Sequence, residues 1–200
     1  MADLILASGS PRRRALLAQL GLPFRVLSPD IDETPLADEA HIAYGLRLAQ
    51  AKAQAVAERL RADQVVLAAD TVVILAADTL GIDEQGEILG KPQDADEARA
   101  MLRRLRARTH LVCTAFCLLA LPSGQQHCQA VQTLVTMRDY SDAEIDAYVA
   151  SGDPFDKAGG YAIQHEGFAP VAHIQGSYDN VVGFPLAEIA AALRRFGLLS

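Results

Sequence analysis

The segment from Val65 to Leu75 carries the strongest structural signal in the sequence. Its eleven residues are apolar except for Asp70 and Thr71, and β-branched residues are frequent among them. Such a composition is typical of a strand inside a sheet, where branched side chains pack well against their neighbours. The segment therefore predicts a central strand that carries one polar pair in an otherwise apolar run.

Strand-like and helix-like segments alternate along the rest of the chain. The strand-like segments are short apolar runs, whereas the helix-like segments repeat apolar residues at helical spacing or are rich in alanine and leucine. We expect further strands over residues 4–7, 24–27, 111–121 and 129–137, and helices over residues 15–20, 40–61, 94–106, 141–152 and 185–196. The alternation predicts an α/β fold with a mixed sheet. No linker is visible, so we expect a single domain over residues 1–200, with a hairpin excursion that starts at residues 76–79 and ends at residues 90–92.

Charge and composition limit the partners that this chain can have. Twenty-five acidic residues against eighteen basic ones give a net charge of −7, which disfavours a nucleic acid or an anionic membrane surface as the main partner. No apolar run reaches the roughly 18 residues of a membrane span, and the N-terminus lacks a secretory pattern. Three cysteines without paired spacing are expected to be reduced. We therefore expect a cytoplasmic protein.

The loop from Ser8 to Arg14 joins the first expected strand to the first expected helix. Ser10 is suited to cap that helix, and Pro11 is suited to its first position. The free N–H groups and the positive end of the helix dipole at such a position attract anions. Three arginines at residues 12–14 oppose the dipole, and an anionic ligand would remove this conflict. A solvated basic turn or an interdomain salt bridge is the alternative interpretation.

Two further motifs suggest chemistry. Asp70 places a carboxylate inside an apolar strand, where an unpaired charge is costly and a partner is required. A buried ion pair is one interpretation, and binding a metal or accepting a proton is the other.

Lys91 lies between Gly90 and Pro92, which hold it on a stiff loop. Such a loop suits a lysine that binds phosphate, and it is also common as a simple turn.

A glycine-rich segment extends from Asp156 to Gln164. Paired glycines lie between a charged start and a short apolar stretch that ends in the glutamine. The amide of Gln164 can donate and accept hydrogen bonds, so it either reads the edge of a base or is an ordinary loop residue.

The sequence contains no HExxH pair, no P-loop motif and no GxSxG turn. A zinc site, a P-loop ATPase and a serine hydrolase are therefore not expected.

Five motifs, in order along the chain, resemble the Maf family. They are SGSPRR at residues 8–13, ADTVV at 69–73, GKP at 90–92, DKAGGYAIQ at 156–164 and GSYDNVVG at 176–183. The resemblance implies a fold similar to that of inosine triphosphate pyrophosphatase, with an elongated mixed sheet, flanking helices and two lobes around a central cleft. It also implies a homodimer that hydrolyses nucleoside triphosphates to the monophosphate and pyrophosphate with a divalent metal cation, Mg²⁺ or Mn²⁺.

The same resemblance assigns roles to individual residues. Asp70 would accept a proton from water, Glu33 would be the second carboxylate at the metal, and Lys91 would act in catalysis. The residues expected to hold the triphosphate are Ser8, Arg13, Lys52, Lys91 and Lys157. The residues expected to select the base are Arg12, Thr71 and Gln164.

The segment that ends at Gln164 resembles the branch of the family that acts on dTTP and UTP, with 5-modified pyrimidine nucleotides as further substrates to consider. The branch that acts on 7-methyl-GTP is the enzymatic alternative. A non-catalytic nucleotide-binding regulator of septum formation is the alternative of another class. All three lysines of the chain, against fifteen arginines, fall at positions that the resemblance assigns to phosphate. A small triphosphate responds to such a local cluster of cations even when the net charge is −7.

Overall fold

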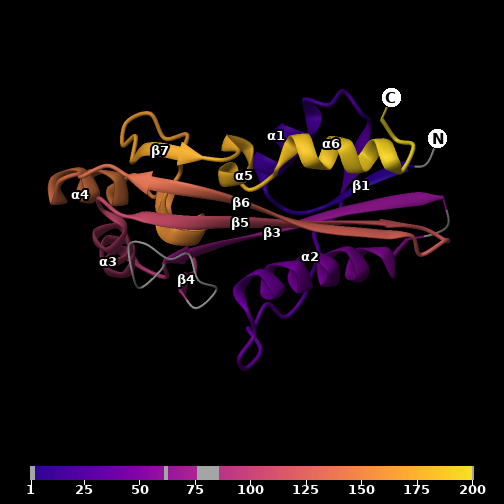
Figure 1. The fold of residues 1–200 in the computed structure, drawn as a ribbon, viewed down its shortest axis with the longest axis horizontal. Helices are drawn as coiled ribbons and strands as arrows, with labels where there is room; N and C mark the ends of the chain where they lie inside the picture. Colours follow the sequence, from indigo (N-terminus) through magenta and orange to yellow (C-terminus); the bar gives the residue numbers. More distant parts are fainter. Residues whose placement is uncertain (1–2, 61–62, 76–85, 200) are drawn as a thin grey trace. The chain divides into compact units, whose positions relative to one another are not determined.

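The computed structural model describes residues 3–60, 63–75 and 86–199 and contains one mixed β-sheet (Figure 1). Its strands are β1 (Asp3–Ala7), β2 (Phe24–Val26), β3 (Gln64–Leu75), β4 (Glu87–Leu89), β5 (Thr109–Ala120), β6 (Gln126–Met137) and β7 (Val171–Gln175). The strand order is β2-β1-β3-β5-β6-β7, with β4 paired to β3. β1 runs parallel to both β2 and β3, whereas β4 is antiparallel to β3 and β7 is antiparallel to β6. The predicted α/β fold with a mixed sheet is confirmed.

The chain divides into two compact units, each built from segments distant in sequence. The first unit comprises Met1–Asp70, Thr114–Val131 and Gly183–Ser200, and the second comprises Thr71–Cys113 and Gln132–Val182. The helices of the first unit are α1 (Pro11–Ala18), α2 (His41–Ala57) and α6 (Leu186–Arg195). Those of the second are α3 (Ala95–Leu105), α4 (Asp142–Ala150), α5 (Tyr178–Val182) and two 3₁₀ turns, Asp153–Asp156 and Ala158–Gly160. None of the helices formed by described residues is long and apolar enough to cross a membrane. The expectation of a single domain stays a prediction.

In the first unit, helices cover both faces of β1 and of the first half of β3. Figure 1 shows α2 on one side of these strands and α1 and α6 on the other. Ile5 and Val66 belong to the core cluster that includes Ala53 of α2. Leu6 and Leu67 are also fully buried, and the alternation of side chains along a strand directs them to the opposite face. Burial of both faces explains why the sequence is continuously apolar here rather than alternating.

The second unit has its own core, to which α3 and α4 contribute. Leu102 of α3 and Ile145 and Tyr148 of α4 are buried in this core. Ser141 caps the N-terminus of α4 in the predicted capping box. Its hydroxyl accepts a hydrogen bond from the N–H of Glu144, and the Glu144 carboxylate accepts one from the N–H of Ser141. The helix predicted over residues 141–152 is therefore confirmed, and it ends at Ala150.

Other predictions for helices and strands need correction. The helix expected over residues 40–61 ends at Ala57, because the next residues form tighter hydrogen bonds, such as that from the Leu60 N–H to the Ala57 carbonyl. The sequence does not predict β7, in which His173 and Gln175 interrupt any apolar run, or α5, whose five residues form little more than one helical turn. Of the hairpin excursion expected from residues 76–79 to residues 90–92, residues 76–85 lie outside the described residues, whereas its last part contains β4, which pairs antiparallel with β3.

The expectation of three reduced cysteines is wrong for two of them. Cys117 on β5 and Cys128 on β6 form a disulfide, with a Cα–Cα distance of 4.1 Å, while Cys113 is buried and is not part of a disulfide. The two strands are neighbours in the sheet. Their pairing brings these cysteines together although their sequence separation is 11.

Candidate active site

A cluster in the first unit contains three of the expected site residues, Lys52, Asp70 and Glu33. Lys52, from α2, donates from Nζ to Oδ1 of Asp70, in β3, at 2.6 Å, and its Nζ lies 2.8 Å from Oε1 of Glu33. Lys52 and Asp70 are each 8% exposed, whereas the Glu33 side chain is 52% exposed. The charge partner that the sequence requires for Asp70 is therefore Lys52, and one ammonium group joins both carboxylates.

The parallel pairing of β1 with β3 explains why Ser8 and Asp70 belong to one edge of the sheet. Ala7 pairs with Ala68, so Ser8 leaves β1 at the level where β3 continues towards Asp70. Ser8 is buried, and its Oγ accepts a hydrogen bond from the N–H of Ser10 at 3.2 Å. Ser10 then caps α1 as predicted. The strand register and the helix cap together place the start of α1 at this edge.

Arg13 connects the start of α1 to two other segments of the first unit. Its Nε donates to the carbonyl of Gly183 at 2.9 Å, and its Nη1 donates to the carbonyl of Ala69 at 2.7 Å. The same Nη1 lies 3.5 Å from Oγ of Ser8. Burial lowers the pKa of Arg13, and Asp70 opposes this effect, but an arginine remains charged at neutral pH. The guanidinium is thus a fixed positive charge near Ser8 and Asp70.

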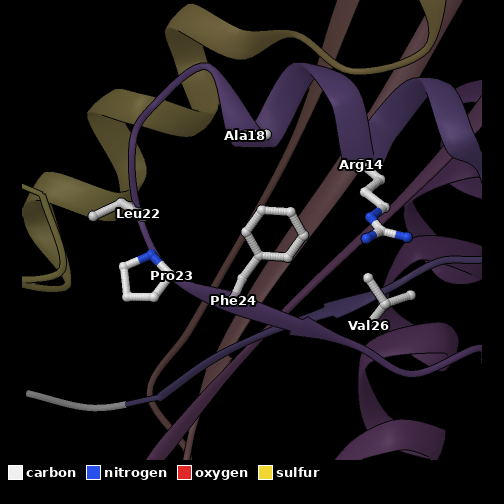
Figure 2. A pocket seen from close by; sticks show the side chains of 6 residues that line it. All are labelled: Arg14, Ala18, Leu22, Pro23, Phe24 and Val26. Atoms are coloured by element: carbon white, nitrogen blue, oxygen red, sulfur yellow. The ribbon is translucent and has the colours of Figure 1, made fainter.

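The other two arginines of the basic triplet have different surroundings. Arg14 lines a surface groove of about 480 Å³ in the first unit (Figure 2). The other residues that line the groove are Ala18, Leu22, Pro23, Phe24 and Val26, none of which is an expected site residue. Arg12 is half-buried, and its role in base selection stays a prediction. Arg14 of the triplet therefore lines a groove to which none of the expected site residues contributes.

In the second unit, Lys157 lies in a network of its own. It is 8% exposed, and its Nζ donates to the carbonyl oxygen of Asp153 at 2.6 Å, to Oδ1 of Asp153 at 2.9 Å and to Oδ1 of Asp156 at 2.6 Å. The hydroxyl of Tyr148 donates to Oδ2 of Asp153 at 2.8 Å. Burial raises the pKa of Asp153, but the hydrogen bonds from Lys157 and Tyr148 bring it below its usual value. Since an ammonium group has three donors, all those of Lys157 have acceptors within this unit.

The loop that carries Lys91 contacts the glycine-rich segment that follows Lys157. The N–H of Gly159 donates to the carbonyl of Gly90 at 2.9 Å. Gly159 has a φ of +73°, and a Cβ atom there would approach Val73 to 3.1 Å, so the position favours glycine. Lys91 itself is exposed. The second unit therefore brings its two lysine-bearing loops together.

Tyr161 anchors the segment that leads to Gln164. Its hydroxyl forms a hydrogen bond of 2.7 Å with Nε2 of His110 on β5, and both side chains are buried. Burial lowers the pKa of His110 to about 3, so its imidazole is neutral at physiological pH. Gln164 is exposed, and Thr71, at the start of this unit, is half-buried. The roles of Gln164 and Thr71 in base selection stay predictions.

The chemistry of the Lys52 cluster fits a hard divalent cation. Asp70 and Glu33 contact the same ammonium group and offer carboxylate oxygens, which Mg²⁺ and Mn²⁺ prefer as ligands. Within residues 3–60, 63–75 and 86–199, no group of three or more His, Cys, Asp or Glu residues could hold a metal ion. Mg²⁺ commonly binds through one or two carboxylates and completes its coordination with water and substrate phosphate.

Two residues that sequence reasoning missed hold the segment around Glu33. The side chains of Tyr44 and Arg47, both on α2, donate to the backbone carbonyls of Glu33 and Thr34. The one sequence signal for them is that they lie on the same predicted helix as Lys52, with Tyr44 about two turns before it. Residues at such a spacing are able to reach one neighbouring segment.

Comparison with solved structures identifies the class of fold. The structure of the Staphylococcus aureus Ham1 protein matches this chain with a TM-score of 0.53 at 14% sequence identity. The match covers 98% of this chain and 97% of that chain. The two proteins therefore share a fold, in agreement with the fold that the sequence motifs imply.

The family follows from comparison of sequences. A family model described as Maf-like protein matches residues 3–196. A relative from Myxococcus xanthus is 52% identical over 98% of this chain and 93% of its own length, and one from Anaeromyxobacter dehalogenans strain 2CP-1 is 50% identical over 97% and 94%. A third, from Methylococcus capsulatus, is 48% identical over 98% and 91%, and all three are named dTTP/UTP pyrophosphatase. The chain belongs to the Maf family, as its five motifs indicate.

Proposed function

We propose that this protein hydrolyses the pyrimidine nucleoside triphosphates dTTP and UTP to the nucleoside monophosphate and pyrophosphate. The names of its relatives support this substrate class, because the similarity extends over nearly the whole chain. The observation that carries the proposal is the Lys52 cluster, in which the buried carboxylate of Asp70 and the half-exposed carboxylate of Glu33 share one ammonium group. Such a cluster supplies a base and ligands for a cation at one place.

Asp70 is the proposed base. Cleavage between the α and β phosphates requires that a water molecule lose a proton as its oxygen attacks phosphorus, and a carboxylate can accept that proton. The hydrogen bond from Lys52 fixes the orientation of the Asp70 carboxylate before substrate arrives. Arg13, a fixed positive charge near Ser8, would hold a phosphate oxygen together with the Ser8 hydroxyl.

Asp70 and Glu33 are also the proposed ligands of Mg²⁺ or Mn²⁺. The cation, when bound, would neutralise charge on phosphate oxygens and on the departing pyrophosphate. For both carboxylates to bind it, Lys52 must give up at least part of its contact with them. Its ammonium group then becomes available to a phosphate oxygen, so one rearrangement would prepare both the metal site and the phosphate site.

Residues of the second unit have proposed roles of their own. Lys91, exposed on its loop, would bind phosphate and stabilise the departing pyrophosphate. Lys157 would bind phosphate after it exchanges one of its three acceptors. Thr71 and Gln164, together with Arg12 of α1, would select the base.

An assay of pyrophosphate release tests the proposal. The full chain is incubated with Mg²⁺ or Mn²⁺ and a panel of dTTP, UTP, 7-methyl-GTP and the common purine nucleoside triphosphates. We expect dTTP and UTP to be hydrolysed fastest. The Asp70→Asn variant should lose at least about a hundredfold in kcat, the usual contribution of a general base. Asp63→Asn is the matched control, because Asp63 is exposed and its φ of +67° suits asparagine.

Each other outcome has a definite meaning. Preferential hydrolysis of 7-methyl-GTP would place the protein in that branch of the family. Binding of dTTP without metal-dependent turnover would favour the non-catalytic regulator. A folded Asp70→Asn variant with the wild-type rate would exclude Asp70 as the base.

The proposal includes a homodimer in the cytoplasm that has no nucleic acid as a partner. The family resemblance supports the dimer, and the net charge of −7 disfavours a nucleic-acid partner. Sedimentation of the purified chain measures the first property, and a binding assay with labelled DNA and RNA measures the second.

A further inference from the structure

The segment that carries Glu33 is irregular, yet its carboxylate has a defined position. No helix or strand is assigned to residues 27–40, which lie between the end of β2 and the start of α2. The Glu33 side chain is 52% exposed, so packing around it does little to fix it. Its Oε1 nevertheless lies 2.8 Å from Nζ of Lys52. A ligand on such a segment needs support for its backbone if it is to bind a cation without a large entropic cost.

Tyr44 and Arg47 of α2 supply that support. The hydroxyl of Tyr44 donates to the carbonyl oxygen of Glu33 at 2.8 Å. Nη2 of Arg47 donates to the carbonyl oxygen of the next residue, Thr34, at 3.1 Å. Two side chains of one helix therefore hold two successive peptide groups, and the first of these belongs to the carboxylate residue itself.

Arg47 holds the same segment at a second point. Its Nε and Nη2 donate to the two carboxylate oxygens of Glu39, at 2.6 and 2.7 Å, and Glu39 Oε2 also accepts from the N–H of Leu36 at 3.2 Å. The hydrogen bond from Arg47 lowers the pKa of Glu39, which keeps this pair charged at neutral pH. The Arg47 guanidinium also lies 5.4 Å from the centre of the Tyr44 ring, within the range of a cation–π contact. The two residues thus support each other as well as the segment.

We infer that Tyr44 and Arg47 are positioning residues that set the affinity of the Glu33 carboxylate for a divalent cation. This inference rests on the proposed function, because it takes Glu33 as a ligand. Three residues of helix α2 would then support the proposed cation site: Lys52 neutralises the two carboxylates, and Tyr44 and Arg47 hold the backbone of the Glu33 segment. Neither Tyr44 nor Arg47 would contact the reacting atoms.

Tyr44→Phe and Arg47→Gln test the inference in the full chain. Mn²⁺ alone is titrated into each protein, and free Mn²⁺ is followed by electron paramagnetic resonance, so that the readout does not depend on turnover. We expect each variant to bind Mn²⁺ about three- to tenfold more weakly, because Tyr44→Phe removes one hydrogen bond to the backbone of the Glu33 segment and Arg47→Gln removes another, together with the pair to Glu39. In kinetics, the Mn²⁺ concentration for half-maximal rate should rise by a similar factor, while kcat at saturating Mn²⁺ changes less than about twofold.

Arg104→Gln is the matched control. Arg104 forms a two-pronged pair with Glu87 in the second unit, so this variant also removes an arginine from a paired glutamate but leaves the Glu33 segment intact. Its Mn²⁺ affinity should equal that of the wild type. Thermal unfolding of each variant verifies that it is folded.

A double-mutant cycle with Glu33→Gln separates positioning from a general effect on the fold. If Tyr44 acts through Glu33, Tyr44→Phe should have no effect on Mn²⁺ binding once Glu33 is glutamine. An undiminished effect in that background would overturn the inference. If Glu33→Gln weakens Mn²⁺ binding and neither Tyr44→Phe nor Arg47→Gln does, the inference alone fails. If Glu33→Gln itself leaves Mn²⁺ binding unchanged, the proposed ligand role of Glu33 fails and the inference falls with it.

Discussion

Replacing Lys52 with methionine should destabilise the protein and make its stability depend on divalent cations. Methionine keeps most of the apolar stem of lysine, so the change removes the ammonium group and leaves little empty space. The carboxylate of Asp70 loses the hydrogen bond of 2.6 Å from Nζ, and Glu33 loses its contact at 2.8 Å. Two negative charges then share one site without the cation that joins them.

The magnitude follows from the burial of the pair. The side chains of Lys52 and Asp70 are 10% and 11% exposed, and removing one partner from such a pair costs roughly 3–5 kcal/mol. The contact with Glu33 adds at most about 1 kcal/mol, because the Glu33 side chain is 52% exposed. We expect the free energy of unfolding to fall by about 3–6 kcal/mol. For a domain of this size, that loss lowers Tm by roughly 6–24 °C.

Urea unfolding of three proteins measures the effect and its cause. The three proteins are the wild type, Lys52→Met and the double variant Lys52→Met/Asp70→Asn. The double variant also removes the carboxylate that has lost its partner, so it should regain most of the lost stability. Mn²⁺ should raise the Tm of Lys52→Met more than that of the wild type, because a cation no longer competes with the ammonium group for Asp70 and Glu33. Lys91→Met is the matched control, since Lys91 is exposed and the same change should cost less than about 0.5 kcal/mol.

Two results would refute this reasoning. A loss below about 1 kcal/mol in Lys52→Met would mean that Lys52 and Asp70 behave as an exposed pair. The free energy of unfolding could also fall as expected in Lys52→Met without recovering in the double variant with Asp70→Asn. The cost would then come from packing of the lysine stem and not from an unpaired Asp70 carboxylate.

Two other predictions concern the second unit. Asp156→Asn removes the charge of one acceptor of Lys157, which should be the easiest to exchange because the Asp156 side chain is 60% exposed. In steady-state kinetics, the KM for dTTP should therefore fall up to about fivefold at constant kcat. An unchanged KM would show that Asp156 and substrate phosphate do not compete for Lys157. Hydrogen bonds from the Ser141 N–H, Arg138 and the Ser141 hydroxyl lower the pKa of Glu144 from 4.5 to about 2. Its folded pKa is depressed, so its contribution to stability is complete above about pH 4.5 and is lost as the pH falls towards about 2. The difference in Tm between wild type and Glu144→Gln should therefore narrow over this range, and a constant difference would contradict the assignment.

The fold was predictable where segments are long enough to show a period. The run from Val65 to Leu75 becomes a strand because its side chains are buried on both faces, which composition alone indicates. β7 has five residues and owes its existence to pairing with β6, in which Leu134 is opposite Gln175. The disulfide between Cys117 and Cys128 likewise depends on the register of two strands, which the composition of a hairpin does not determine.

The site was predictable in kind but not in arrangement. An aspartate inside an apolar strand needs a charge partner, and this requirement holds whichever residue supplies it. The partner of Asp70 is 18 residues earlier on α2, and the contact depends on how that helix packs against the sheet. Similarly, the acceptors of Lys157 come from the 3₁₀ turn Asp153–Asp156, which has no helical period for a sequence pattern to reveal.

The scarcity of lysine in the sequence has a physical explanation at two of its three positions. Lys52 and Lys157 are each 8% exposed, and each ammonium group contacts two carboxylates from different residues. A compact charge with three rotatable donors can join such carboxylates, whereas the donors of arginine are fixed in one rigid plane. The same property allows a lysine to exchange one oxygen ligand for another without reorienting a rigid plane, as binding of a phosphate would require. Arg13 shows the contrast, because its guanidinium is fixed between the carbonyl groups of Ala69 and Gly183. Arg13 thus holds its charge in place, whereas the proposed phosphate-binding roles of Lys52 and Lys157 would require charges that can change partners.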